Sequence, residues 1–134
     1  IFYKKILKLV KKKKNFKYFK SLGKQKYFSC IRYCDAVIGN SSSGITEVPS
    51  MKKFTINIGD RQKGRLFAKS IINTKLTEEA IKRSIKKVYD TNFYKKFYNL
   101  KNPYDKSKTS FKIAKVLKSI KLNKLYNKKF FDIK

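Results

Sequence analysis

The residues best suited to bind a ligand form a short stretch rich in glycine and serine, Gly39 to Gly44. The stretch follows a run of apolar residues and precedes a segment with helical periodicity, so it predicts a turn between a strand and a helix. Free backbone N–H groups and hydroxyls at a helix start, where the helix dipole is positive, favour an anion. The stretch is not a Walker loop, because its spacing differs and no Lys-Ser or Lys-Thr pair ends it. A turn of this composition can equally be a helix cap or an ordinary loop.

The placement of charge supports the anion-binding interpretation. No ionisable side chain occurs from Ala36 to Thr46, although charged residues make up 33% of the sequence. A buried strand explains Ala36–Ile38, but a ligand lying close to the backbone better explains the small polar residues after it. The first charge beyond the stretch is Glu47, whose carboxylate could accept hydrogen bonds from vicinal hydroxyls such as those of a ribose. The alternative is a surface acid that the helix dipole favours.

Two arginines follow the next predicted strand. Only four of the 36 basic residues are arginine, and Arg61 and Arg65 are two of them. A guanidinium is planar and can donate paired hydrogen bonds to phosphate oxygens. Both side chains are therefore candidate ligands of a diphosphate, and the alternative is that they are solvated cations of a loop.

Helices and strands alternate around these residues. Helices are predicted at Phe2–Lys14, around Tyr27–Cys34, from Ser41–Gly44 past Glu47, at Phe93–Leu100, and at Ile113–Ile120. A further helix is predicted to begin at the N-cap Thr77 and to bury a stripe of Ile81, Ile85 and Val88. Strands are predicted from Phe16 to Leu22 before a turn at Gly23, at Ala36–Ile38, at Phe54–Ile58 and at Ser70–Ile72. This order predicts an α/β, Rossmann-like three-layer sandwich, in which ligands bind outside the carboxyl ends of the strands. Gly39 and Gly59 both lie at such ends.

Composition limits the function classes. The 134 residues, 41% of them hydrophobic, suit one domain with its own core. A net charge of +28 would suit nucleic acid or an anionic surface, but the excess of lysine over arginine looks compositional. A Lys-rich module that binds nucleic acid or an anionic surface is therefore the alternative function, and nucleic acid is not an expected partner.

The cysteines and the apolar residues indicate the cellular compartment in which we expect the protein. Cys30 and Cys34 lie one helical turn apart and the sequence has no histidine, so no zinc site or Cys-His nucleophile can form from this segment. Buried thiols suit a reducing cytoplasm. No apolar run approaches the roughly 20 residues that a membrane span needs. We therefore expect a cytoplasmic protein with no membrane partner, no metal and no cofactor.

Two long motifs resemble a known family. Asp35 to Ile45 with Glu47, Pro49 and Ser50, and then Thr55 to Arg65, are similar to the hydrolysing UDP-N-acetylglucosamine 2-epimerases, which make N-acetylmannosamine or related sugars for sialic-acid-type synthesis. Ser21-Leu22-Gly23 with Tyr27, and Asn102-Pro103-Tyr104, extend the resemblance to about Asn15–Ile120. Phe54 departs from the pattern, because family members usually have proline there.

The resemblance implies the C-terminal domain of a two-domain enzyme of the glycosyltransferase-B (GT-B) type. Residues 1–122 would be part of a Rossmann-like UDP-binding domain, residues 123–134 a basic tail, and the N-terminal catalytic domain would be missing. By correspondence of motifs, Ser41 and Ser42 would bind the diphosphate, and Ser43 and Gly44 of the same turn would also contact the substrate. Glu47 would hold the ribose hydroxyls, and Arg61 and Arg65 would be phosphate ligands. Leu22 and Tyr27 would frame the uracil.

The resemblance also implies where the chemistry would take place. Family members are thought to eliminate UDP to a glucal and then add water, using carboxylates of the N-terminal domain and a histidine early in the C-terminal domain. This sequence contains none of those residues, so we predict no catalytic residue here and no activity of the chain alone. The helical pattern already present at Ile1 predicts a longer parent protein, which we expect to be a homo-oligomer that acts on a UDP-sugar. A GT-B glycosyltransferase would share the diphosphate site and is a further alternative.

Overall fold

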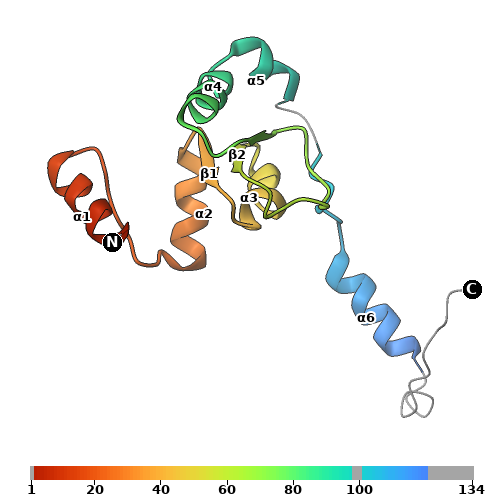
Figure 1. Cartoon of the computed structure of the whole chain (residues 1–134). Coiled ribbons are helices and arrows are strands. Elements are labelled where there is room, and N and C mark those ends of the chain that lie inside the picture. The colour runs from red at the N-terminus through yellow and green to blue at the C-terminus, as the bar shows by residue number, and fades with distance from the viewer. Residues whose placement is uncertain (1, 98–100, 121–134) are drawn as a thin grey trace, which may run out of the picture. The chain divides into compact units, whose positions relative to one another are not determined.

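Parallel strands form a sheet at the centre of residues 1–103 (Figure 1). Strands β1 (Ala36–Gly39), β2 (Phe54–Ile58) and β3 (Ile71–Thr74) pair in the order β1-β2-β3. Gly39 lies opposite Asn57, and Asn57 lies opposite Asn73. The predicted parallel crossover is confirmed, and the third strand is longer than predicted because it continues to Thr74. The carboxyl ends of all three strands therefore lie at one edge of the sheet.

The computed structural model describes residues 2–97 and 101–120, and the chain forms two compact units, 1–103 and 104–134. Within the first unit, helices flank both faces of the sheet, so the fold is α/β. Within the second unit, α6 (Thr109–Ser119) confirms the last predicted helix, and its apolar side chains are largely exposed. The predicted basic tail from residue 123 and the predicted helical position of Leu100 lie outside the described residues.

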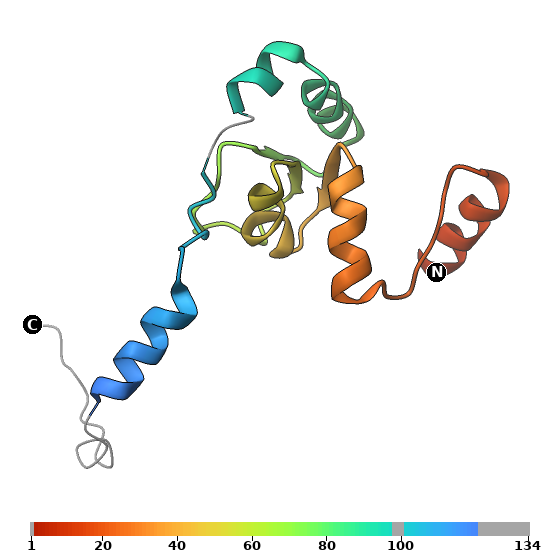
Figure 2. The same cartoon turned by 180° about the vertical axis from the view of Figure 1, so that it is seen from behind.

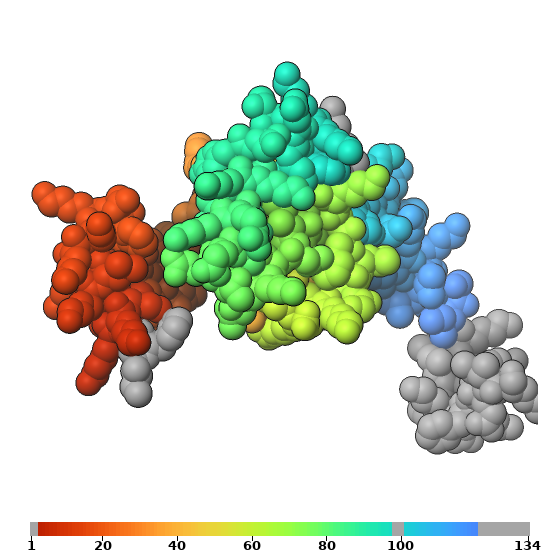
Figure 3. Space-filling model, turned by 45° about the horizontal axis from the view of Figure 1, so that its top comes forward, coloured from red at the N-terminus to blue at the C-terminus, as the bar shows by residue number. Residues whose placement is uncertain are grey.

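One face of the sheet carries the hydrophobic core. Alternate residues of a strand point to the same face, and Phe54 and Ile56 of β2 and Ile72 of β3 are buried together with Val88. The helices over this face are α4 (Glu78–Val88) and α5 (Thr91–Phe97), whose green and teal atoms face the viewer in Figure 3. Stacked rings extend the core from β2 onto α5, with Phe54 and Phe93 centroids 5.3 Å apart. Burial of these large side chains is the main contribution to stability.

Helix α4 begins as the sequence predicts but buries a different stripe. The Thr77 hydroxyl accepts a hydrogen bond from the Ala80 N–H at 3.3 Å, which confirms the N-cap. The buried residues are Ala80, Ser84 and Val88, so the prediction was right for Val88. It was wrong for Ile85, which is 37% exposed, and Ile81 is only half-buried. The small side chains at positions 80 and 84 therefore form part of the buried stripe of the helix together with Val88.

The opposite face is covered by the connection between β1 and β2, and Figures 1 and 2 both place it across the sheet from α4 and α5. The connection holds α3 (Ser43–Thr46) and the 3₁₀ helix η1 (Val48–Met51). Ile45 and Val48 are fully buried there. The predicted helix past Glu47 was too long, because Pro49 lacks an N–H and its ring clashes with the carbonyl four residues earlier.

The N-terminal part differs from the prediction in one element. Helix α1 (Phe2–Lys12) ends two residues earlier than predicted, and α2 (Gly23–Tyr33) starts at the predicted turn, where Gly23 has a φ of +65°. The predicted strand from Phe16 to Leu22 is absent from the described residues. A strand needs a neighbour to bond its backbone, and this segment instead places Tyr18 against Tyr3 of α1, with ring centroids 5.5 Å apart.

Candidate functional site

The candidate site lies where β1 and β2 end side by side. The turn after β1 contains the serines, and the loop after β2 contains the arginines. Gly59 begins that loop with a φ of +73° and donates its N–H to the Thr74 carbonyl at 3.0 Å. A left-handed residue here is least strained as glycine. The two loops are therefore brought together by the parallel pairing of the strands.

The serine turn is tightly hydrogen-bonded. The N–H groups of Ile45 and Thr46 both donate to the Ser42 carbonyl at 2.9 Å, and the Ser43 N–H donates to the Ser41 hydroxyl at 3.4 Å. Ser41 and Ser42 are exposed, and the Ser42 side chain makes no capping hydrogen bond. Because α3 has only four residues, its dipole is weak, and the predicted anion site stays a prediction that rests mainly on side chains. What the turn offers an anion is its hydroxyls.

Gly44 holds the turn against the sheet. The Thr55 hydroxyl donates to the Gly44 carbonyl at 2.6 Å, and a β-carbon on residue 44 would lie 2.7 Å from the Thr55 methyl group. Both residues are buried. Gly44 is thus required for close approach of backbone to strand, and its predicted contact with substrate stays a prediction.

A chain of hydrogen bonds joins three predicted site residues. The Tyr27 hydroxyl lies 2.6 Å from the Ser43 hydroxyl, and the Ser43 hydroxyl donates to the Glu47 carboxylate. Tyr27 comes from α2, Ser43 begins α3, and Glu47 follows α3 directly. The structure therefore gathers side chains from two helices beside the serine turn.

Leu22 and Tyr27 line one surface hollow. The hollow has a volume of about 350 Å³ and is also lined by Phe19, Ser21 and Gly23. It is open to solvent, and its walls are largely apolar. A planar base could lie against such a wall, so the predicted contact of both residues with uracil is sterically possible and stays a prediction.

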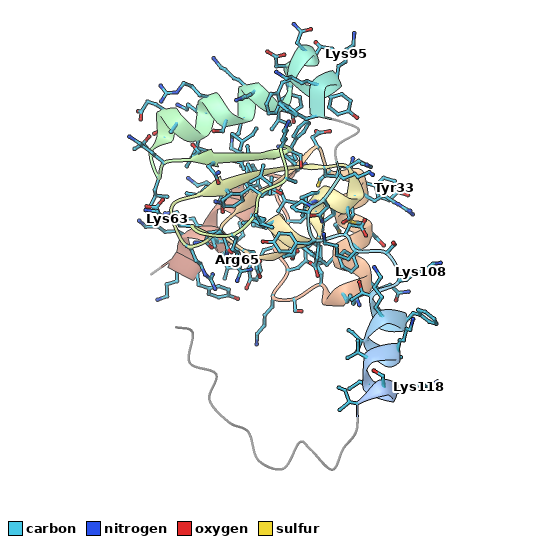
Figure 4. The ribbon with its side chains drawn as sticks, turned by 90° about the vertical axis from the view of Figure 1, so that its right-hand side faces the viewer. Tyr33, Lys63, Arg65, Lys95, Lys108 and Lys118 are labelled. Atoms are coloured by element: carbon cyan, nitrogen blue, oxygen red, sulfur yellow. The ribbon has the colours of Figure 1, made fainter. Side chains whose placement is uncertain are left out.

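The arginines lie on the loop after β2. Arg61 and Arg65 are both exposed, and Figure 4 shows Arg65 and Lys63 on this loop. Within residues 2–97, neither guanidinium is hydrogen-bonded to the serine turn. The link between the two loops is instead Gln62, which is 3% exposed and donates its Nε2–H to the Asn40 carbonyl at 2.7 Å. Its Oε1 is buried without a partner in the described part of the chain.

Sequence patterns did not identify Gln62 or Asn102. The Asn102 amide is 5% exposed and donates to the Thr46 carbonyl at 2.7 Å and to the Ser50 hydroxyl at 2.8 Å. The first bond holds the backbone just before Glu47, and the second holds the side chain of Ser50 after it. Asn102 lies 56 positions from Thr46, so no local signal could reveal the contact; the inclusion of both residues in the resembling motifs was the available hint.

Metal-binding clusters and membrane-spanning helices are both absent from the described residues. There, no three His, Cys, Asp or Glu side chains gather closely enough to hold a metal ion. None of the helices described is long and apolar enough to cross a membrane.

A three-stranded parallel sheet flanked by helices, with polar loops at the carboxyl ends of its strands, places the chain in the α/β class of folds, in which ligands bind at that edge. Within that class, the chain is a member of the UDP-N-acetylglucosamine 2-epimerase family, whose sequence model matches residues 2–118.

Three curated proteins illustrate the similarity. The chain is 40% identical over 123 residues, 91% of its length, to "Polysialic acid biosynthesis protein P7" of Escherichia coli. It is 42% identical over 118 residues, 87% of its length, to "GDP/UDP-N,N'-diacetylbacillosamine 2-epimerase (hydrolyzing)" of Campylobacter jejuni. It is 31% identical over 104 residues, 78% of its length, to "UDP-N,N'-diacetylbacillosamine 2-epimerase (hydrolyzing)" of Legionella pneumophila. The matched regions cover 32%, 30% and 26% of these relatives, so the chain spans about a third of their length.

Proposed function

We propose that this chain supplies the UDP-binding part of a hydrolysing UDP-N-acetylglucosamine 2-epimerase of sialic-acid-type sugar synthesis. The parent enzyme would convert UDP-N-acetylglucosamine, or a modified relative, and water to UDP and N-acetylmannosamine or the corresponding sugar. In this proposal, residues 1–122 belong to the C-terminal domain of a GT-B-type enzyme, and the catalytic residues lie in the rest of a longer chain.

One observation carries the proposal. The serine turn, the hydrogen-bonded group of Tyr27, Ser43 and Glu47, and the arginine loop all lie at the carboxyl edge of β1 and β2, within a chain of the epimerase family. Hydroxyls of Ser41 and Ser42 would bind the diphosphate, Glu47 would accept from ribose hydroxyls, and Arg61 and Arg65 would neutralise phosphate charge. The other acids of the described chain are scattered except Glu78 and Glu79, which are exposed at the start of α4, and none of them lies in the serine turn where acid–base work on a bound sugar would need a carboxylate pair.

The proposal specifies the UDP part of the substrate and leaves the identity of the sugar to experiment. Two of the relatives carry N,N'-diacetylbacillosamine in their names, whereas the family is described by N-acetylglucosamine. The two sugars differ on the pyranose ring, and UDP is the common part that the residues of this chain would hold. We therefore propose a UDP-sugar substrate and expect the rest of the enzyme to select the ring substituents.

The full-length protein tests the proposal directly. It is incubated separately with UDP-N-acetylglucosamine and UDP-N,N'-diacetylbacillosamine, and UDP and free sugar are quantified by chromatography. Equal amounts of UDP and the 2-epimerised sugar from either substrate support an epimerase. Both substrates intact after prolonged incubation contradict it, and UDP release that requires an added sugar acceptor indicates a glycosyltransferase. Oligonucleotide binding that is sensitive to salt and insensitive to UDP would favour the nucleic-acid alternative.

A further inference from the structure

The hydrogen-bond chain from Tyr27 to Glu47 has a defined direction. A serine hydroxyl has one hydrogen, and an ionised carboxylate only accepts. Because Ser43 gives its hydrogen to Glu47 Oε2, the Tyr27 hydroxyl must be the donor to Ser43 across the 2.6 Å contact. Each of the three side chains thereby fixes the next.

Glu47 needs such support more than its neighbours do. Its side chain is exposed and has three rotatable bonds, so an unrestrained carboxylate would populate several rotamers. Its backbone, by contrast, is fixed, because the Glu47 N–H donates to the Ser43 carbonyl at 2.9 Å. The Ser43 hydroxyl, one turn earlier, holds the carboxylate, and this leaves Oε1 open to a ligand.

Tyr27 connects this short helix to a separate element. It lies 16 positions before Ser43, in the 11-residue helix α2, and is half-buried. The Ser43 hydroxyl alone could rotate away from Glu47, but a second bond from Tyr27 restricts that rotation. Hydrogen bonds in a chain also polarise and strengthen one another.

We propose that Tyr27 is a positioning residue which, through Ser43, presents the Glu47 carboxylate to the vicinal hydroxyls of a ribose and so sets the preference for ribonucleotides. The proposal rests on the proposed function and deepens it. Tyr27 is thereby given a task beyond lining the hollow with Leu22: its hydroxyl, and not only its ring, contributes to recognition. Pre-organisation of this kind increases affinity because less freedom is lost on binding.

The test compares UDP with 2',3'-dideoxy-UDP, which lacks both hydroxyls, by calorimetry on the full-length protein. Wild type should prefer UDP by roughly 10- to 100-fold, the effect of a charged hydrogen bond. Tyr27→Phe keeps the ring and should reduce this preference by roughly two- to tenfold through weaker UDP binding, with little change for the dideoxy nucleotide. In a Glu47→Ala background, Tyr27→Phe should leave the preference unchanged.

Tyr33→Phe is the matched control. Tyr33 ends the same helix, is 88% exposed, and lies in Figure 4 at the other end of the strands from Lys63. The Tyr33→Phe variant should bind UDP and 2',3'-dideoxy-UDP with the affinities of wild type. If Tyr27→Phe does not fold, as judged by circular dichroism, Ser43→Ala breaks the same chain and should reduce the preference likewise.

The outcomes distinguish failure of the proposed UDP-binding function from failure of the positioning role of Tyr27 alone. Wild type that does not bind UDP overturns the proposed function and the positioning role together. UDP binding in which Tyr27→Phe weakens both nucleotides equally overturns the positioning role alone and assigns Tyr27 to the uracil or to stability. Retained preference in both Tyr27→Phe and Ser43→Ala likewise overturns the positioning role.

Discussion

The side chain of Thr55 occupies the space where residue 44 would carry a β-carbon, and it donates a 2.6 Å hydrogen bond to the Gly44 carbonyl. Strand β2 and the serine turn thus meet with the Thr55 side chain between them and none from residue 44. The contact sets the height of the turn above the sheet, and with it the positions of Ser43 and Glu47.

Substitution Gly44→Ala should therefore destabilise the protein. The new β-carbon would lie 2.7 Å from the Thr55 methyl group, and overpacking of this kind costs about 1–3 kcal/mol. Adding Thr55→Ser removes the methyl group and keeps the hydroxyl, so the double variant should regain most of the loss. Urea denaturation followed by circular dichroism measures both. Equal midpoints for Gly44→Ala and its double variant would refute the proposed clash.

The stability of the protein should suffer more from a charge at position 62 than from loss of the Gln62 hydrogen bond. Gln62→Met removes the bond to Asn40 and also the unpartnered Oε1, so the net cost should be modest, about 0.5–1.5 kcal/mol. Gln62→Glu places a carboxylate against the Asn40 carbonyl at a site only 3% exposed, and should cost about 3 kcal/mol or more. Urea denaturation midpoints test whether Gln62→Glu is less stable than Gln62→Met.

The exposed neighbour provides the control for that series. Lys63→Gln should leave the midpoint unchanged, because Lys63 is exposed. Both Gln62 variants should also bind UDP more weakly, because the hydrogen bond from Gln62 to the Asn40 carbonyl positions the loop that carries Arg61. A glutamate variant as stable as the methionine variant would contradict the burial argument.

Arg61→Ala should weaken UDP binding by about 1–3 kcal/mol, the range for a lost hydrogen bond to a charged group. Arg61→Lys retains the charge but not the forked geometry, and should restore only part of the loss. Calorimetry with the full-length protein measures the affinities. Arg83→Ala is the control, because it removes the same charge on α4, which lies across the sheet from the serine turn, and should have little effect. Equal losses at both positions would indicate unspecific charge attraction.

The Cys34 thiol should react slowly at neutral pH. Burial raises its pKa, an effect that the nearby Lys53 ammonium opposes only in part. A raised pKa means less thiolate at a given pH, so the alkylation rate should increase at higher pH than for an ordinary thiol. Iodoacetamide labelling of a Cys30→Ser variant across pH measures this. The same variant unfolded in urea is the control, and coincident profiles would contradict the prediction.

Local patterns determined much of this protein. The apolar runs at Ala36 and Phe54 identified two strands of the sheet, and Thr77 with two glutamates after it identified the start of α4. These features depend on neighbours within a few positions, where hydrophobic periodicity and capping act. The long motifs around Ser41 and Arg61 likewise identified the family, because they are a property of the sequence itself. Pro49 could also have predicted the early end of α3, since its effect is local.

The tertiary structure alone decided which side chains meet. Gln62 reaches Asn40 across 22 positions, Tyr27 reaches Ser43 across 16, and Asn102 reaches Thr46 across 56. It also decided that α4 buries Ala80 and Ser84 and leaves Ile85 exposed, because the way a helix docks on a sheet selects which of its residues are covered. Such contacts depend on how strands pair and helices dock, and each amide or hydroxyl has several possible partners until the backbone is folded. The sequence therefore determined which groups are available for binding, whereas the packing of α2, the crossover and the loop after β2 determined how they are held.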